Sequence, residues 1–203
     1  MGNEAKCTVA SGGKRVAGKA LLETAELIFR SDALKLKIPF AKMKSVKAVG
    51  GELRVQSPDG GFVFELGPDA EKWAHKILHP KSRLEKLGIE KGTKVTIIGK
   101  LEADFEGELA AAASSVMQGT IAKDTECIFL NAETMKELER AKNIAKVMRG
   151  AVPLWIVYPK GRKEITENDV LATGRKAGLK DVKVVGFSAT HTALKFVIPV
   201  QKR

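Results

Sequence analysis

The chain has 203 residues, of which 44% are hydrophobic and 29% are charged, the composition of a folded protein with one large domain or two small ones. No apolar run approaches the roughly 18 residues that a transmembrane helix needs, and the first residues form no apolar leader, so we predict a cytoplasmic protein without a transmembrane segment. The net charge of +11 is compatible with weak, non-specific polyanion binding, but the excess of Lys and Arg is spread over both halves of the chain.

Residues 6–66 have the pattern of short strands separated by turns. Apolar and charged residues alternate, most clearly where Leu34, Leu36 and Ile38 are interleaved with lysines, as expected of strands with one buried face. Glycine pairs between the later strands suit tight hairpin turns, so we predict an antiparallel meander. The expected strands cover residues 6–10, 16–22, 26–29, 34–38, 45–49, 52–56 and 62–66.

A helix is predicted directly after this meander. Pro68 suits its first turn, Trp73 belongs to an apolar face with helical spacing, and Pro80 stops it. About seven short strands followed by one amphipathic helix with a central Trp resemble the pleckstrin-homology-like fold over residues 5–79. The resemblance implies a first domain, residues 1–80, in which the helix plugs the open end of a bent sheet.

Two residue clusters of this first segment suggest ligands but have simpler explanations. Glu71, His75 and His79 recur every four residues on the predicted helix, yet three ligands on a solvated face are fewer than the four of a structural metal site, so we predict no metal. The strand lysines are expected to be solvated and to protect sheet edges.

Cys7 and Cys127 lie in different halves and are expected to be unpaired.

The second half is organised around Lys-Val-Thr-Ile-Ile-Gly at 94–99, which has the composition of a buried parallel strand. Strand and helix then alternate up to a terminal hairpin. This order predicts a three-layer α/β domain with a mostly parallel sheet and an antiparallel hairpin at its end. We expect helices at 81–87, 104–116, 134–148 and 166–177, and strands at 94–98, 120–123, 126–130, 153–159, 183–187 and 194–200.

The terminal hairpin and the run Pro-Leu-Trp-Ile-Val-Tyr-Pro-Lys at 153–160 carry a second resemblance. The order of elements resembles the class I methyltransferase fold, a Rossmann-like fold, with one helix and one strand missing from its first half. The run and its hairpin are also similar to a bacterial family of unknown function that carries this shortened domain. The resemblance covers residues 81–200 and implies a second domain, residues 81–203.

The methyltransferase resemblance implies an adenosylmethionine site at the turn that begins with Gly99. Leu101 and Ala103 occupy positions where the motif of that family has glycine, so bulk replaces the space for the cofactor. Asp124 corresponds to the acidic residue that would hold ribose hydroxyls. Residues 131–134 do not match the signature of amino-group methyltransferases. Gly99 and Asp124 are therefore cofactor-binding residues only if the protein is a methyltransferase.

Other chemistries find less support in the sequence. A loop with Lys160, Arg162 and Lys163 follows a strand, where open α/β sheets bind ligands, and is the candidate anion site. Ser188 and His191 lie at a hairpin tip, where no oxyanion hole and no orienting carboxylate can be identified. We predict no catalytic residue.

These observations lead to one prediction and one alternative. The prediction is a non-catalytic cytoplasmic binding protein without a cofactor, whose partner is a protein. The alternative is an adenosylmethionine-dependent methyltransferase with an aberrant cofactor loop. The short connection at 79–82 further predicts one fixed unit, with Leu84 and Leu87 buried at the seam between the two domains.

Overall fold

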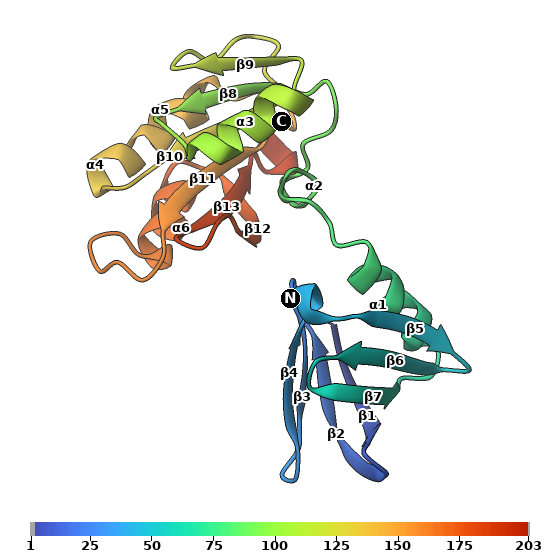
Figure 1. Ribbon diagram of the computed structural model, residues 1–203. Helices are drawn as coiled ribbons and strands as arrows, with labels where there is room; N and C mark the ends of the chain where they lie inside the picture. Colours follow the sequence, from blue (N-terminus) through green and yellow to red (C-terminus); the bar gives the residue numbers. More distant parts are fainter. Residues whose placement is uncertain (1–2, 203) are drawn as a thin grey trace. The chain divides into compact units, whose positions relative to one another are not determined.

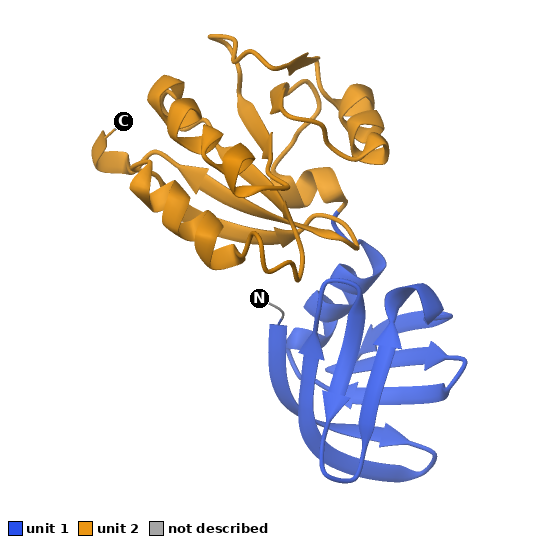
Figure 2. Ribbon diagram, turned by 90° about the vertical axis from the view of Figure 1, so that its left-hand side faces the viewer, with its two compact units in different colours: residues 1–81 blue, residues 82–203 orange. Residues whose placement is uncertain are grey.

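The computed structural model describes residues 3–202 and divides into two compact units, residues 1–81 and 82–203 (Figure 2). No helix within the described residues is long and apolar enough to cross a membrane.

Unit 1 is one antiparallel sheet followed by a helix. The strand order is β4-β3-β2-β1-β7-β6-β5, and the sheet bends so that β5, β6 and β7 run across the direction of the other strands (Figure 1). The strands β1 and β7 pair only at Val9–Phe64 and Ala10–Val63. The bounds are β1 Asn3–Ser11, β2 Lys14–Leu22, β3 Glu26–Arg30, β4 Lys35–Pro39, β5 Ser45–Val49, β6 Glu52–Ser57, β7 Gly60–Glu65 and α1 Asp69–Leu78, with a 3-10 turn at Phe40–Lys42.

The core of unit 1 follows from strand alternation. Phe29, Leu53 and Phe64 are fully buried, and Trp73 of α1 is 1% exposed among them. The helix packs against β5 and β6. The antiparallel meander and its closing helix are thus confirmed, whereas the pleckstrin-like assignment stays a prediction.

Unit 2 is a three-layer α/β structure. Helices α2 and α3 cover one face of the sheet, and α4, α5 and α6 cover the other. The bounds are α2 Arg83–Leu87, β8 Lys94–Ile98, α3 Ala103–Ala112, β9 Ser115–Gln118, β10 Cys127–Asn131, α4 Met135–Leu138, α5 Arg140–Val147, β11 Leu154–Pro159, α6 Glu167–Lys176, β12 Lys180–Gly186 and β13 His191–Val197, with a 3-10 turn at Val200–Lys202.

The sheet of unit 2 has the order β9-β8-β10-β11-β13-β12. The first four strands in this order run parallel to one another. β13 is inserted antiparallel between β11 and β12. The chain leaves β8 toward β9 on one side and later returns to β10 on the other, so the strand order reverses between β8 and β10. This reversal is the topological switch point, the place where open α/β sheets bind ligands.

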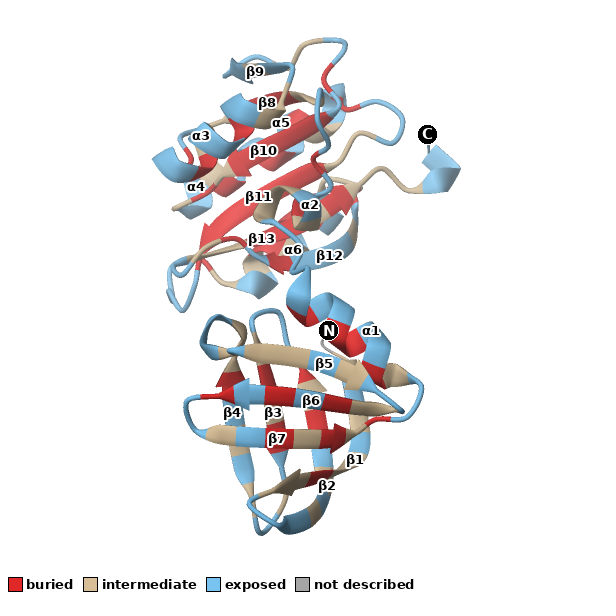
Figure 3. Cartoon of the chain, turned by 45° about the vertical axis from the view of Figure 1, so that its right-hand side comes forward, coloured by how far each residue is buried: buried red, intermediate tan, exposed pale blue. Residues whose placement is uncertain are grey.

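The apolar runs of β10 and β11 are explained by burial on both faces, which Figure 3 shows as nearly continuous red. Successive residues face opposite cores: Leu154 and Ile156 point to the α4–α6 side, while Trp155 points to the α2–α3 side. The indole Nε1 of Trp155 donates to the carbonyl of Leu87 at 3.0 Å. This bond fixes the end of α2 to the middle of the sheet.

Several predicted boundaries in unit 2 are wrong. The helix expected at 104–116 ends at Ala112, and the strand expected at 120–123 lies at Ser115–Gln118, where it pairs with β8. Helix propensity favours continuing through the alanines, but pairing beside β8 lets residues 115–118 satisfy their backbone groups in the sheet. The helix expected at 134–148 is divided into α4 and α5 at Glu139.

The predicted seam residues pack inside unit 2. Leu87 is 1% exposed in the core on the α2–α3 side, and Leu84 packs against the same cluster. The helix that carries them begins with a capping box between Ser82 and Glu85 and ends at Gly88, which has a left-handed φ of 74°. Burial of these leucines therefore needs no partner beyond unit 2.

Candidate functional site

A cavity of about 230 Å³ lies at the switch point, where loops after β8 and β10 meet the β12–β13 turn. Polar groups from three separate loops converge there, which is the usual composition of a binding site in this fold class. The lining residues are Lys100, Leu101, Glu102, Asn131, Glu133, Val157, Phe187 and His191.

The turn after β8 is held close to the end of β10. Gly99 has a φ of 97°, and a Cβ atom at this position would lie 3.2 Å from Cβ and 3.3 Å from the carbonyl oxygen of Asn131. Both the backbone conformation and the close approach require glycine. Asn131 then donates from Nδ2 to the carbonyl of Lys100 at 2.8 Å, which ties the two loops together.

The N-terminus of α3 is already occupied by carboxylates of the chain itself. Glu106 Oε1 accepts from the backbone N–H of Leu101 at 3.0 Å, and Asp104 lies in the same first turn. A hydrogen bond from Arg83 holds the pKa of Asp104 below its usual value. Because anions favour a helix N-terminus mainly through free N–H groups, this end offers an incoming anion little.

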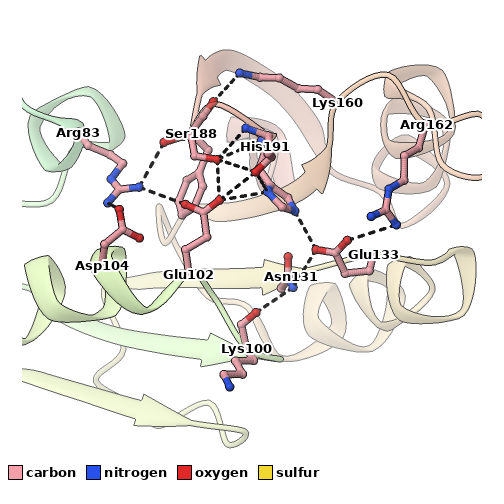
Figure 4. A network of polar contacts seen from close by, with 12 residues as sticks. Arg83, Lys100, Glu102, Asp104, Asn131, Glu133, Lys160, Arg162, Ser188 and His191 are labelled. Carbon is pink, nitrogen blue, oxygen red and sulfur yellow. Dashed lines mark hydrogen bonds and ion pairs between the residues drawn. The ribbon is translucent and has the colours of Figure 1, made fainter.

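His191 lies between two glutamates at the centre of the site (Figure 4). Its Nδ1 is 3.2 Å from Glu102 Oε1, and its Nε2 is 2.8 Å from Glu133 Oε1. Nδ1 also lies 2.9 Å from Thr190 Oγ1, so this nitrogen can accept from the hydroxyl or donate to an acceptor, according to the tautomer of the ring. The imidazole side chain is 17% exposed, against 29% and 34% for the two carboxylates.

The contacts extend into a row of five side chains, because an arginine lies on the outer side of each glutamate. Arg83 Nη1 lies 3.4 Å from Glu102 Oε2, and Arg162 Nη1 lies 3.8 Å from Glu133 Oε2 (Figure 4). Together with His191 they give the order arginine, glutamate, histidine, glutamate, arginine across the loop edge of the sheet. The row joins the start of α2, the start of α3, the β12–β13 turn and the loops after β10 and β11.

Ser188 is part of this network without being activated as a nucleophile. Its Oγ donates to Glu102 Oε1 at 2.6 Å and accepts from the backbone N–H of His191 at 3.1 Å. A serine nucleophile needs a hydrogen bond from its Oγ to a base, and the imidazole nitrogens are directed at the glutamates instead.

The expectation that no carboxylate orients His191 is wrong. Glu102 and Glu133 are 89 and 58 residues away in the chain, so proximity in the sequence gives no sign of them. The sequence offers one indication of this contact. A glutamate follows each of β8 and β10, and the loops after these two strands both face the switch point.

The two cofactor-binding residues expected from the methyltransferase resemblance lie at opposite ends of β8. Gly99 follows its last residue, whereas Asp124 is 2.7 Å from Nζ of Lys94, its first. Since β9 ends at Gln118, the residue that follows this strand is Gly119. The acidic position implied by the resemblance is therefore not filled by Asp124.

The predicted anion loop is placed at the same edge as the cavity, but two of its cations already have acceptors. Lys160 Nζ donates to the carbonyl of Ser188 at 2.5 Å, and Arg162 pairs with Glu133. Lys163 is exposed. Anion binding by this loop stays a prediction.

No family model matches the chain, and no curated protein matches it. Similar solved structures include the N-methyltransferase NodS from Bradyrhizobium japonicum WM9, at 14% identity over 58% of this chain and 92% of that chain, with a TM-score of 0.43. A SAM-dependent methyltransferase from Aquifex aeolicus is 15% identical over 61% and 96%, with a TM-score of 0.39. The C-terminal domain of an unknown protein from Leishmania infantum is 16% identical over 38% and 78%, with a TM-score of 0.31.

Methyltransferases are the class of enzyme named by the alternative prediction, but structural similarity at these identities and TM-scores says nothing about activity.

The switch-point cavity, as folded, does not fit adenosylmethionine. Leu101 is 5% exposed where the cofactor loop would need glycine, and Gly99 is in contact with Asn131. Pockets for drug-sized ligands measure about 300–1,000 Å³. The cavity of about 230 Å³ is below this range, and adenosylmethionine is a molecule of that size class.

Proposed function

We propose that unit 2 is a small-molecule-binding module whose ligand is a small organic cation bound at the switch-point cavity. One observation carries this proposal: the carboxylates of Glu102 and Glu133, from two neighbouring loops, converge on the cavity with the planar imidazole of His191 between them. A planar group between two carboxylates is held by hydrogen bonds from N–H groups, so the site favours a ligand that donates N–H groups to both, which phosphates and carboxylates cannot do.

Larger hollows elsewhere support a ligand less well. Unit 1 has hollows of about 660 Å³ and 470 Å³ that are shallow and lie along strands. A third of about 450 Å³ lies at the end of β10 opposite the switch point, and its polar residues Lys123, Thr125 and Arg149 have no role in the network described above. Volume alone does not identify a site. Ligand sites in open α/β sheets lie at the switch point and have a few convergent polar groups.

Adenosylmethionine-dependent methyl transfer is the second candidate function. The strand order of unit 2, with β13 inserted antiparallel between β11 and β12, is methyltransferase-like and supports it. The size of the cavity and the buried Leu101 oppose it. No methyl-transfer step is derived from a site that does not fit the donor.

Calorimetry with the full chain separates these functions. Methylguanidinium chloride is the probe for a small cation, and adenosylmethionine is the probe for the methyl donor. We expect methylguanidinium to bind and Glu133→Gln to weaken it by about 10-fold or more, the value of one hydrogen bond between charged groups. Glu139→Gln is the matched control, because this glutamate is exposed in the helical segment and lies outside the cavity.

Two results decide against the proposal. Equal binding by the Glu133 and Glu139 variants would place the cation elsewhere on the surface. Micromolar binding of adenosylmethionine, with transfer of its labelled methyl group to any acceptor, would establish the second candidate in its place.

A further inference from the structure

We propose that His191 is a built-in competitor for the switch-point cavity, and that the ligand it excludes is a planar organic cation of the imidazolium or guanidinium class. The inference rests on the proposed function, since it concerns which cation the same cavity takes and what controls its entry.

The chemistry of the ligand is given by the group that now fills its place. The imidazole is planar and presents two nitrogens on opposite sides, one to Glu102 at 3.2 Å and one to Glu133 at 2.8 Å. A ligand that replaces it must bridge the same two carboxylates. Imidazolium and guanidinium groups are planar and donate in several in-plane directions, whereas a carboxylate or phosphate has no hydrogen to donate.

The surroundings of the two glutamates leave one position for a ligand, between the two carboxylates. Arg83 lies beyond Glu102 and Arg162 lies beyond Glu133, so each carboxylate already has one positive neighbour on its outer side. Lys100 lines the cavity as well. Because the outer sides of both carboxylates are occupied, an external ligand and the ring of His191 compete for the one position between them.

The turn that carries His191 is held independently of its imidazole. The backbone N–H of His191 donates to Ser188 Oγ at 3.1 Å, and the backbone N–H of Lys160 donates to the carbonyl of Thr190 at 2.8 Å. Phe187, on the other side of the turn, is 2% exposed. The imidazole can therefore leave the cavity by side-chain rotation while the backbone of the turn stays in place.

Competition of this kind lowers the apparent affinity of the ligand. The measured dissociation constant equals the intrinsic one divided by the fraction of molecules whose site is open. Removing the imidazole removes that factor and leaves a gap of its own shape between the two carboxylates. His191→Ala should then bind free imidazole in its protonated form more tightly than the unmodified chain does.

The test uses ¹H–¹⁵N spectra of the full chain titrated with imidazolium chloride. We expect saturable shifts at the amides of 99–102 and 131–133 in His191→Ala, with binding at least about 10-fold tighter than in the unmodified chain. His79→Ala is the matched control, because this exposed histidine lies in unit 1. The same weak, unsaturated response in both variants would overturn the inference.

A second measurement does not depend on the variant folding. The chain has three histidines, so the ring nitrogens of His191 can be resolved from those of His75 and His79 in the unmodified protein. Methylguanidinium should change the ring signals of His191 selectively as it displaces the imidazole. Binding of this probe without any change at the His191 ring would overturn the inference.

The two claims fail separately. Imidazolium binding by His191→Ala, with no cation bound by the unmodified chain, would sustain the role of His191 and reject the proposed function. Cation binding by the unmodified chain at the two glutamates, with His191 unaffected, would sustain the proposed function and reject the competitor.

Discussion

Replacing Gly174 by alanine should destabilise unit 2, although alanine is the better helix former. Gly174 is in α6 and packs against Phe196 of β13, the strand that begins at His191. An added Cβ would lie 2.2 Å from the nearest ring atom of Phe196, which is 0% exposed. Overpacking of this kind costs about 1–3 kcal/mol, more than the gain of up to about 1 kcal/mol in helix propensity.

The matched control is Gly107→Ala in α3. A Cβ at this position would meet no atom within 4 Å, so the propensity gain of about 0.5–1 kcal/mol should be the whole effect. The two substitutions are chemically identical and should have opposite signs.

Urea unfolding can be followed separately in each unit. The chain has two tryptophans, Trp73 in unit 1 and Trp155 in unit 2, and the indole N–H of each gives its own NMR signal. With a slope of about 2 kcal/mol per molar urea, the overpacking cost less the propensity gain should lower the Gly174→Ala midpoint of the Trp155 signal by up to about 1 M. A Gly174→Ala midpoint equal to or above that of Gly107→Ala would refute the packing of α6 on β13.

Three further outcomes are expected. Arg83→Met should lower the stability of unit 2 by about 1–3 kcal/mol in the same urea assay, because the side chain is 14% exposed and contacts three carboxylates. Arg175→Met removes an exposed ion pair and should change the stability by less than about 1 kcal/mol. Burial raises the pKa of the Cys127 thiol from 9.0 to about 12. Because the thiol of the unfolded chain ionises first, the free energy of unfolding of unit 2 should fall by up to about 1.4 kcal/mol per pH unit between pH 9 and pH 12. Cys127→Ala should reduce this dependence of stability on pH. If a polyanion binds, replacing the three basic residues of 160–163 by alanine should reduce the slope of log affinity against log salt by up to about three units.

The sequence was sufficient to predict those parts of the fold that have a strong periodic pattern. The alternation around Leu36 and the apolar face around Trp73 predict the meander and its helix, and both are confirmed. The run at 154–159 predicts a central strand because a strand buried on both faces leaves no polar position.

The missed features depend on partners distant in the chain. β9 is a short strand with mostly exposed residues, and only pairing with β8 makes it a strand. The contact of His191 with Glu102 and Glu133 joins residues from three loops, and no local pattern connects them. The prediction that Asp124 lies in the site depends on a strand at 120–123, whereas β9 begins at Ser115, five residues earlier.

The most direct test of the switch-point cavity is a chemical-shift map of the unmodified full chain titrated with methylguanidinium chloride. The account predicts that the largest shifts fall on the amides of 99–102, 131–133 and 187–191, the three loops that surround the cavity. Shifts confined to other parts of the chain, or no saturable shift at any concentration that leaves the chain folded, would contradict it.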